Sequence, residues 1–146
     1  MYRDGRPHGV ARALNRLDAL VLGSGRLGVA RAVTLEVPGR RSGEVVPVPV
    51  VVADLAGERY LVAMLGQRVN WVRNVRAAGG AAVLHHGSRT AVHLEEVPVA
   101  DRAPILKRYL ALAPGARAHI PVDRRAPVAD FERIASKYPV FRIVEE

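Results

Sequence analysis

Two patterns of hydrophobic spacing divide the chain into strands and helices. Runs rich in β-branched residues predict about six strands, at 32–37, 45–53, 59–65, 81–85, 89–97 and 140–144. Apolar residues at helical spacing predict helices that begin near residues 10, 69, 98 and 128, and the composition of residues 113–127 indicates a loop. Helices inserted among mostly antiparallel strands favour an α+β antiparallel barrel over a parallel sheet.

The length of the chain and its first residues indicate the domain organisation. A chain of 146 residues is long enough for one compact core. We expect a single domain over residues 32–146, preceded at 1–31 by a basic amphipathic helix and a linker. Such a helix usually packs on its own domain, and the alternative is peripheral contact with a membrane. Because the sequence has no membrane-length apolar run, no signal-peptide pattern and no cysteine, we expect a cytoplasmic protein, with membrane association as the alternative.

The charge balance indicates an anionic partner. Lysine and arginine number 22 against 14 acidic residues, a formal net charge of +8, and nearly all of the basic residues are arginine. Arginine matches the geometry of phosphate and carboxylate groups, so the excess suits a polyanionic small molecule, a nucleic acid or an anionic membrane. Aromatic residues make up only 5% of the chain and do not alternate with basic ones, which argues against nucleic acid.

A glycine-rich loop between the first two predicted strands is the main candidate for a binding site. Residues 37–43 read Val-Pro-Gly-Arg-Arg-Ser-Gly, so Arg40, Arg41 and Ser42 lie between Gly39 and Gly43. Guanidinium groups, a hydroxyl and the N–H groups of a glycine turn together suit an anion such as phosphate. The alternative is an ordinary hairpin turn whose arginines are only solvated.

Other motifs give weaker candidates. Residues 23–28 match G-x-G-x-x-G, but a helical pattern precedes them and a strand follows, which is the wrong context for a dinucleotide site. His85 and His86 are adjacent on a predicted strand and face opposite sides. Even with His93 across the hairpin they have no nearby carboxylate, and we expect no metal site. Because no nucleophile with histidine and carboxylate partners is evident, an enzymatic role would depend on a cofactor.

Several segments occur together in an order typical of one family. They are 34–43 with its Gly-Arg-Arg-Ser-Gly loop, the proline-containing strand that follows, the turn 64–67, the segment 70–74 with its Trp-x-x-Asn pattern, and Tyr138-Pro139. The chain resembles the deazaflavin-dependent nitroreductase and quinone reductase family over residues 32–144. The resemblance implies a split β-barrel of the flavin-reductase and pyridoxamine-oxidase type. It also implies hydride transfer from reduced coenzyme F420 to a quinone, an enone or a nitroarene.

The resemblance further implies roles for individual residues. Those expected to bind the coenzyme are Gly39, Arg40, Arg41, Ser42 and Gly43 around its phosphate, Val48 and Pro49 on the proline-containing strand, Met64, Leu65, Gly66 and Gln67 along the deazaflavin ring, and Trp71 and Asn74 closing the pocket. Tyr138 is expected on the acceptor side, with packing in the core as an equally weighted alternative. The partner would be a small-molecule electron acceptor.

The chain departs from the family pattern just after the loop. Members that act as nitroreductases tend to carry a further basic residue there, where this chain has Val45 and Val46. The resemblance therefore implies one phosphate contact fewer. We hypothesise that Arg68 or Arg73 compensates for it.

Two other functions are compatible with the same resemblance. Sister branches of the split-barrel superfamily bind flavin mononucleotide (FMN) or haem, so the loop could hold a flavin phosphate instead. Some relatives are non-catalytic binders of lipids or cofactors, and a valine-rich barrel with a basic amphipathic helix suits that role. A homodimer formed through the sheet is plausible for a split barrel, and the sequence also allows a monomer.

Overall fold

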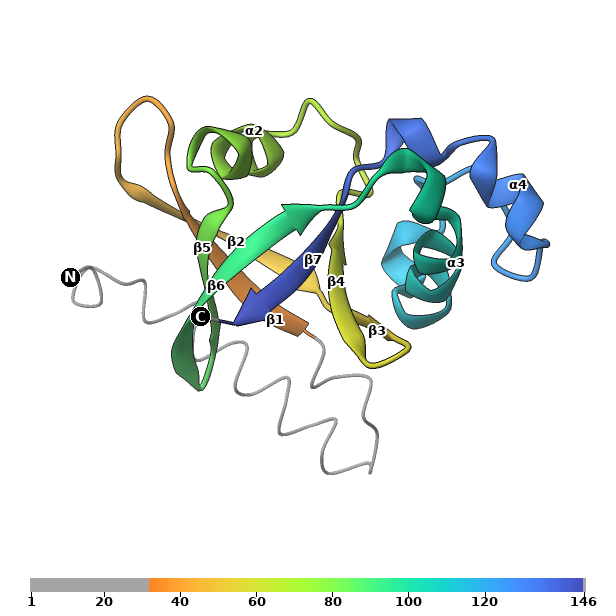
Figure 1. Cartoon of the computed structure of the whole chain (residues 1–146), viewed down its shortest axis with the longest axis horizontal. Coiled ribbons are helices and arrows are strands. Elements are labelled where there is room, and N and C mark those ends of the chain that lie inside the picture. Colours follow the sequence, from red (N-terminus) through yellow and green to blue (C-terminus); the bar gives the residue numbers. More distant parts are fainter. Residues whose placement is uncertain (1–31, 146) are drawn as a thin grey trace.

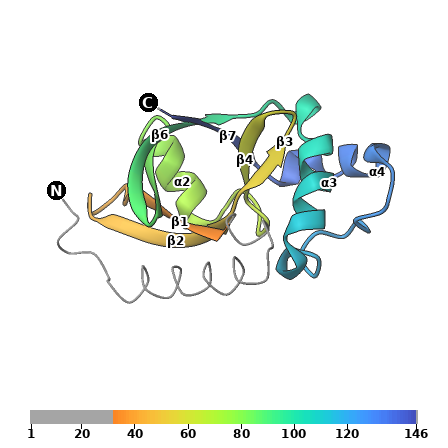
Figure 2. The ribbon, with the colours of Figure 1, turned by 90° about the horizontal axis from the view of Figure 1, so that it is seen from below.

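A single antiparallel sheet forms the centre of the molecule. The structure is a computed structural model that describes residues 32–145. Its strands are β1 (Ala32–Pro38), β2 (Val45–Val51), β3 (Ala53–Leu55), β4 (Glu58–Val62), β5 (Ala81–His86), β6 (Ser88–Glu96) and β7 (Val140–Glu145). They lie in the order β2-β1-β5-β6-β7-β4-β3, and each neighbouring pair is antiparallel. The sheet curls until β2 and β4 come into contact, which makes the half-barrel of Figures 1 and 2.

The helices lie at two ends of this half-barrel. Helix α2 (Asn70–Ala77) lies beside the β1–β2 loop, whereas α3 (Ala103–Leu112) and α4 (Val128–Glu132) lie together at the other end (Figure 1). Three short 3₁₀ turns complete the described chain, η2 (Val99–Asp101), η3 (Pro114–Ala116) and η4 (Ala135–Lys137). Among residues 32–145, no helix is long and apolar enough to cross a membrane.

The prediction of an α+β antiparallel barrel is confirmed, and the structure adds one strand. The predicted strand 45–53 is divided at Val52, because β2 pairs with β1 while β3 pairs with β4 at the opposite edge of the sheet. The predicted strand 59–65 ends at Val62, where the chain turns toward α2. The helix and the G-x-G-x-x-G motif predicted within 1–31 lie outside the described residues.

Two prolines limit what the outer edge of β2 can bind. Pro47 is paired with Glu36 and Pro49 with Thr34, and in the described sheet β2 has β1 as its only neighbour. Proline has no N–H to donate, which is tolerated in an edge strand. This edge therefore lacks two of the donors that a further strand would need, and the prolines oppose dimerisation by strand addition along β2.

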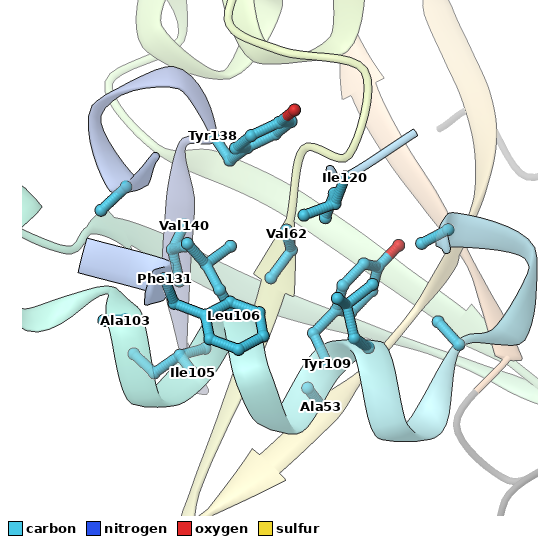
Figure 3. Packing of buried hydrophobic residues seen from close by; sticks show 14 of the residues in the cluster. Ala53, Val62, Ala103, Ile105, Leu106, Tyr109, Ile120, Phe131, Tyr138 and Val140 are labelled. Atoms are coloured by element: carbon cyan, nitrogen blue, oxygen red, sulfur yellow. The ribbon is translucent and has the colours of Figure 1, made fainter. Parts of the chain in front are cut away.

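Two clusters of buried side chains hold the sheet and the helices together. The first lies between the sheet and α2 and includes Leu35, Val72 and Phe141. The second packs α3 and α4 against β4 and β7, with Leu106 and Phe131 at its centre (Figure 3). Full burial of one large apolar side chain is worth about 2 kcal/mol. The helical end is therefore an integral part of the domain.

A buried arginine lies at the edge of the second cluster. Arg102, between η2 and α3, is only 5% exposed. Its Nε donates to the Val97 carbonyl at 2.8 Å, its Nη1 to the Ala135 carbonyl at 3.1 Å, and its Nη2 to the Glu96 carboxylate at 3.2 Å. Burial lowers the pKa of Arg102 from its ordinary value, an effect that the nearby Glu96 carboxylate opposes. One guanidinium group thereby ties the end of β6 to the turn that precedes β7.

We predict that Arg102→Ala destabilises the protein by about 3–5 kcal/mol, because removing one partner leaves buried acceptors without a donor. The measurement is urea unfolding followed by circular dichroism. The matched control is Arg133→Ala, since the Arg133 side chain is 79% exposed on the helical end. The free energy of unfolding of the control should stay within about 0.5 kcal/mol of the wild-type value. Equal unfolding midpoints for the two variants would contradict the role given to Arg102.

Tyr109 should make stability fall at alkaline pH. The residue is 4% exposed, and burial raises its pKa to about 12. Because an unfolded tyrosine ionises near pH ~10, its contribution is complete below that pH and is lost as the pH rises through the folded value. Between about pH 9 and about pH 12, the free energy of unfolding of the wild type should therefore fall by about 2–3 kcal/mol relative to that of Tyr109→Phe. The measurement is a pair of denaturation curves at each pH. A difference that does not change with pH would exclude this effect.

Candidate functional site

The loop between β1 and β2 has an internally bonded backbone. The Gly39 N–H donates to the Glu44 carbonyl at 2.7 Å, and the Gly43 N–H donates to the Gly39 carbonyl at 2.8 Å. The Glu44 N–H donates to Ser42 Oγ at 3.1 Å. Gly43 has a φ of +76°, and a Cβ at Gly39 would lie 3.1 Å from the Ser42 hydroxyl oxygen. Local geometry thus favours glycine at both positions.

Asn74 fixes the position of Arg40. The Asn74 side chain projects from α2, and the residue is 4% exposed. Its Oδ1 accepts two hydrogen bonds from Arg40, one from the backbone N–H at 3.0 Å and one from Nη1 at 2.9 Å. The sheet positions α2 for this contact, because Val72 and Val75 are buried in the first cluster. The loop is therefore braced from outside as well as bonded within.

These bonds leave several donors free at the tip of the loop. Within residues 32–145, the N–H groups of Arg41 and Ser42 form no hydrogen bond, and the exposed Arg41 side chain has no ion pair or hydrogen-bond partner. Arg40 keeps the guanidinium nitrogens that Asn74 does not use, and Ser42 keeps its hydroxyl proton. The tip combines charged, hydroxyl and amide donors, a set that suits a phosphate.

The turn that follows β4 carries two apolar side chains, Met64 and Leu65. The Gly66 N–H donates to the Ala63 carbonyl at 3.0 Å and closes the turn. Met64 is half-buried against the second cluster, whereas Leu65 is 59% exposed. Gln67 is exposed as well. Of the four residues predicted to line a ring, Leu65 offers the most uncovered apolar surface.

Trp71 belongs to the same region but packs mainly inward. It is half-buried against the first cluster, and its ring lies 5.7 Å from that of Phe141 at an angle of 55°. Such a tilted aromatic pair stabilises by about 1 kcal/mol beyond burial. The rest of the Trp71 surface remains accessible, as do Leu65 and Gln67 in the preceding turn. Its predicted part in closing a pocket stays a prediction.

Tyr138 is part of the second cluster. It is 8% exposed, and its hydroxyl donates to the His119 carbonyl at 3.1 Å. Figure 3 shows the ring at the border of the cluster, with the oxygen directed away from Val140. The next residue, Pro139, accepts a hydrogen bond from the Ala63 N–H at 2.9 Å, so Tyr138 adjoins the turn that holds Met64. Its predicted place on the acceptor side remains a prediction.

The two residues predicted on the proline-containing strand face different sides of the sheet. Val48 is paired with Leu35, whose side chain is buried in the first cluster, and Pro49 with Thr34. Because neighbouring strand residues alternate, Val48 shares the α2 side of the sheet and Pro49 the opposite side. Of the two, only Val48 is on the face of the sheet that holds the first cluster.

The residues considered for the missing phosphate contact are accessible. Val46, at the start of β2, is 40% exposed. Arg68 and Arg73 are also exposed, one before α2 and one on it. Within the described part of the chain, neither arginine side chain has an ion pair or hydrogen-bond partner. Both are therefore available to an anion near α2, which is what compensation would need.

A surface ion pair links α2 to Arg102, and sequence reasoning missed it. Arg76, at the end of α2, donates from Nε and Nη2 to the two carboxylate oxygens of Glu96, at 3.0 and 2.6 Å. The hydrogen bond from Arg76 is the main cause that lowers the pKa of Glu96, with Arg102 adding to it. This pair stabilises the fold above the ordinary pKa of a glutamate and weakens as the pH falls through the lowered value. Its partners are 20 residues apart and share no local motif.

The expectation that the histidines have no nearby carboxylate is wrong for His85. Strand β1 pairs with β5, and this places His85 Nδ1 3.9 Å from Oε2 of the buried Glu36. Arg89 Nε donates to the same carboxylate at 3.2 Å. No local sequence pattern predicts that β1 pairs with β5, because the two strands are far apart in the sequence. The described residues contain no group of three metal-ligating side chains.

The comparisons with known proteins identify the family of the chain. Residues 10–131 match the family of F420H2-dependent quinone reductases, and the chain belongs to that family. Membership supports coenzyme F420 as the cofactor and a small-molecule acceptor as the substrate. No curated protein sequence matches the chain.

Several solved structures have a similar fold. An F420H2-dependent reductase called FDR-A has a TM-score of 0.52 at 20% identity, covering 77% of this chain and 93% of its own. A putative 5-nitroimidazole antibiotic resistance protein from Bacteroides thetaiotaomicron has a TM-score of 0.56 at 10% identity, covering 90% and 78%. An FAD-binding protein from Mesorhizobium loti has a TM-score of 0.50 at 17% identity, covering 80% and 81%. These likenesses confirm the split-barrel fold.

Loss of the Asn74 amide should loosen the loop. In Asn74→Ala the Arg40 N–H loses its acceptor, and one lost hydrogen bond of about 1.4 kcal/mol corresponds to roughly tenfold faster amide exchange where exchange follows local opening. The measurement is amide hydrogen exchange by NMR on the protein without coenzyme. Amides of β6 and β7 serve as the internal control, since they lie outside the loop. An unchanged Arg40 exchange rate would show that Asn74 does not brace it.

Proposed function

We propose that the protein transfers a hydride from reduced coenzyme F420 to a quinone, an enone or a nitroarene, with the β1–β2 loop binding the coenzyme phosphate. The observation that carries the proposal is the braced loop. Asn74 holds Arg40 in place, while Arg41 and Ser42 keep their side-chain donors and backbone N–H groups free. A rigid set of unused donors is what tight binding of an anion requires.

The donor set fits the phosphate of this coenzyme. A phosphodiester offers several acceptor oxygens, and guanidinium groups bind two of them at once. The adjacent N–H groups of Arg41 and Ser42 add neutral donors that need no counter-ion. Arg68 and Arg73 supply further positive charge along α2, and we assign to them the compensation for Val45 and Val46.

We assign the deazaflavin ring to the surface beside the turn 64–67 and Trp71. Figure 1 shows the 63–69 segment next to α2, on the side away from the β1–β2 loop. A ligand with its phosphate at the loop would thus extend along α2 toward Leu65, which is 59% exposed. Apolar surface next to a charged anchor is the usual composition of a cofactor site.

The bound coenzyme supplies the hydride, and the chain supplies position. The loop holds the phosphate, and the apolar turn and Trp71 orient the ring and exclude water from one of its faces. Tyr138 is our candidate on the acceptor side, because it adjoins the turn through the bond between Ala63 N–H and the Pro139 carbonyl. A homodimer and a cytoplasmic location remain predictions of the sequence.

Replacing Arg41 should weaken coenzyme binding without affecting the fold. A charge-assisted hydrogen bond contributes about 1.5–3 kcal/mol, so Arg41→Ala should raise the dissociation constant of F420 roughly 10- to 100-fold. The measurement is a fluorescence titration with oxidised F420, run beside FMN. Trp71 is the single tryptophan of the chain and serves as a second reporter.

Arg133→Ala is the matched control, because it removes the same charge from an exposed side chain. Arg133 directly follows α4, which lies at the other end of the molecule from the β1–β2 loop (Figure 1). This control should bind F420 like wild type. Stronger binding of FMN than of F420 would keep the loop assignment and change the cofactor. Binding of neither, or equal affinities of the Arg41 variant and wild type, would refute the proposed site.

A further inference from the structure

An open hollow at the helical end of the molecule resembles a second anion site. It has a volume of about 520 Å³ and is lined by Arg117 and by residues 120–125, within the segment that joins α3 to α4. Pockets of a few hundred Å³ are large enough for a small organic molecule. Both ribbon views place this segment at the far end from the β1–β2 loop along the longest axis (Figures 1 and 2). The hollow is thus separate from the phosphate loop.

The hollow carries an excess of unneutralised positive charge. It is lined by Arg117, Arg124 and Arg125 against a single acidic residue, Asp123. Within residues 32–145, the side chains of Arg124 and Arg125 form no ion pair or hydrogen bond. Oδ1 of Asp123 accepts the Arg125 backbone N–H at 2.7 Å, and within the same residues Asp123 forms no ion pair. Asp123 therefore shapes the loop and leaves the arginines free to bind an anion.

The structure holds Arg117 in a fixed position. Its Nε donates to the Leu110 carbonyl at 3.1 Å and its Nη2 to the Ala111 carbonyl at 3.5 Å. Both carbonyls belong to the last turn of α3, where a cation is favoured. The third nitrogen, Nη1, has no partner among the described residues. Arg117 therefore presents a pre-oriented donor that needs little ordering on binding.

Part of the lining of the hollow is apolar. Ile120 is 1% exposed and anchors the segment in the second cluster, so the apolar surface open to a ligand comes from the exposed Pro121 and the half-buried Val122. A free inorganic ion would gain nothing from this surface. A ligand that combines an apolar body with one anionic group would use both the surface and the arginines.

We propose that this hollow binds the carboxylate, sulfonate or phosphate of an otherwise apolar small molecule. This anionic group is not the phosphate of a coenzyme held at the β1–β2 loop, because the loop and the hollow lie at opposite ends of the molecule. Two sources share the required chemistry, an electron acceptor with an anionic substituent and a separate ligand. The geometry favours the electron acceptor. Tyr138, our candidate on the acceptor side, donates its hydroxyl to the His119 carbonyl at 3.1 Å, and His119 directly precedes Ile120 in the hollow.

The test compares two probes that differ only in charge, 2-naphthoate and 2-naphthamide, by isothermal titration calorimetry on the whole chain. The naphthoate should bind at least about tenfold more tightly, a ratio that corresponds to one charge-assisted contact. The double variant Arg124→Gln, Arg125→Gln should lose this preference, and Arg133→Gln should keep it. Equal binding of the two probes, no binding of either, or a preference that survives the double variant would overturn the proposal.

A kinetic experiment then separates the two sources. Naphthoate is added to the F420H2-dependent reduction of menadione, a neutral quinone. A raised KM for menadione with unchanged kcat would identify the hollow as part of the acceptor site, and an unaltered KM would identify a separate ligand. The calorimetric result does not depend on turnover. Failure of the proposed reductase activity can therefore be told apart from failure of this site.

Discussion

The buried guanidinium of Arg102 is the interaction on which the rest of the structure depends. A cation this far from water is tolerated only because its donors are matched, two nitrogens by main-chain carbonyls and one by Glu96. Glu96 also accepts two hydrogen bonds from Arg76, and Arg76 ends the helix that carries Asn74. A continuous series of contacts thus runs from the helical end to Arg40 in the loop. The buried charge thus connects the second cluster, through Glu96 and Arg76, to the helix that holds the loop.

Most of the fold could be predicted from the sequence because its signals are local. β-Branched runs identified most of the strands, and apolar residues at helical spacing identified a helix near residue 98. In the structure this helix is α3, which buries Ile105, Leu106, Tyr109 and Leu110. The break at Val52 could not be predicted in this way. It arises because β2 and β3 belong to opposite edges of a curled sheet, which is a property of the strand order of the whole sheet and not of the segment.

The candidate site also has features that local sequence predicts and features that only the folded structure shows. Gly39 and Gly43 were recognisable because a tight loop restricts which residues fit there. The hydrogen bonds from Arg40 to Asn74, the Arg76–Glu96 pair and the carboxylate beside His85 all join residues at least 20 positions apart. The family resemblance put Asn74 at the pocket, and the structure adds that it braces the loop. Long-range polar contacts of this kind depend on the packed fold, so a single sequence contains no direct signal for them.

The arginine excess has a structural part and a part that is free to bind ligands. Arg59, Arg108 and Arg142 are paired with carboxylates across neighbouring elements, and such exposed pairs add little stability individually. The arginines with no side-chain partner among residues 32–145 are Arg41, Arg68, Arg73, Arg124 and Arg125. They occur in two groups, one around the loop and α2 and one in the hollow between α3 and α4. Uncompensated charges repel one another and cost stability unless an anion binds them. They gather at two places, one near the exposed Leu65 and one beside the accessible Pro121 and Val122, and both proposed sites rest on this combination of unpaired guanidinium groups and apolar surface.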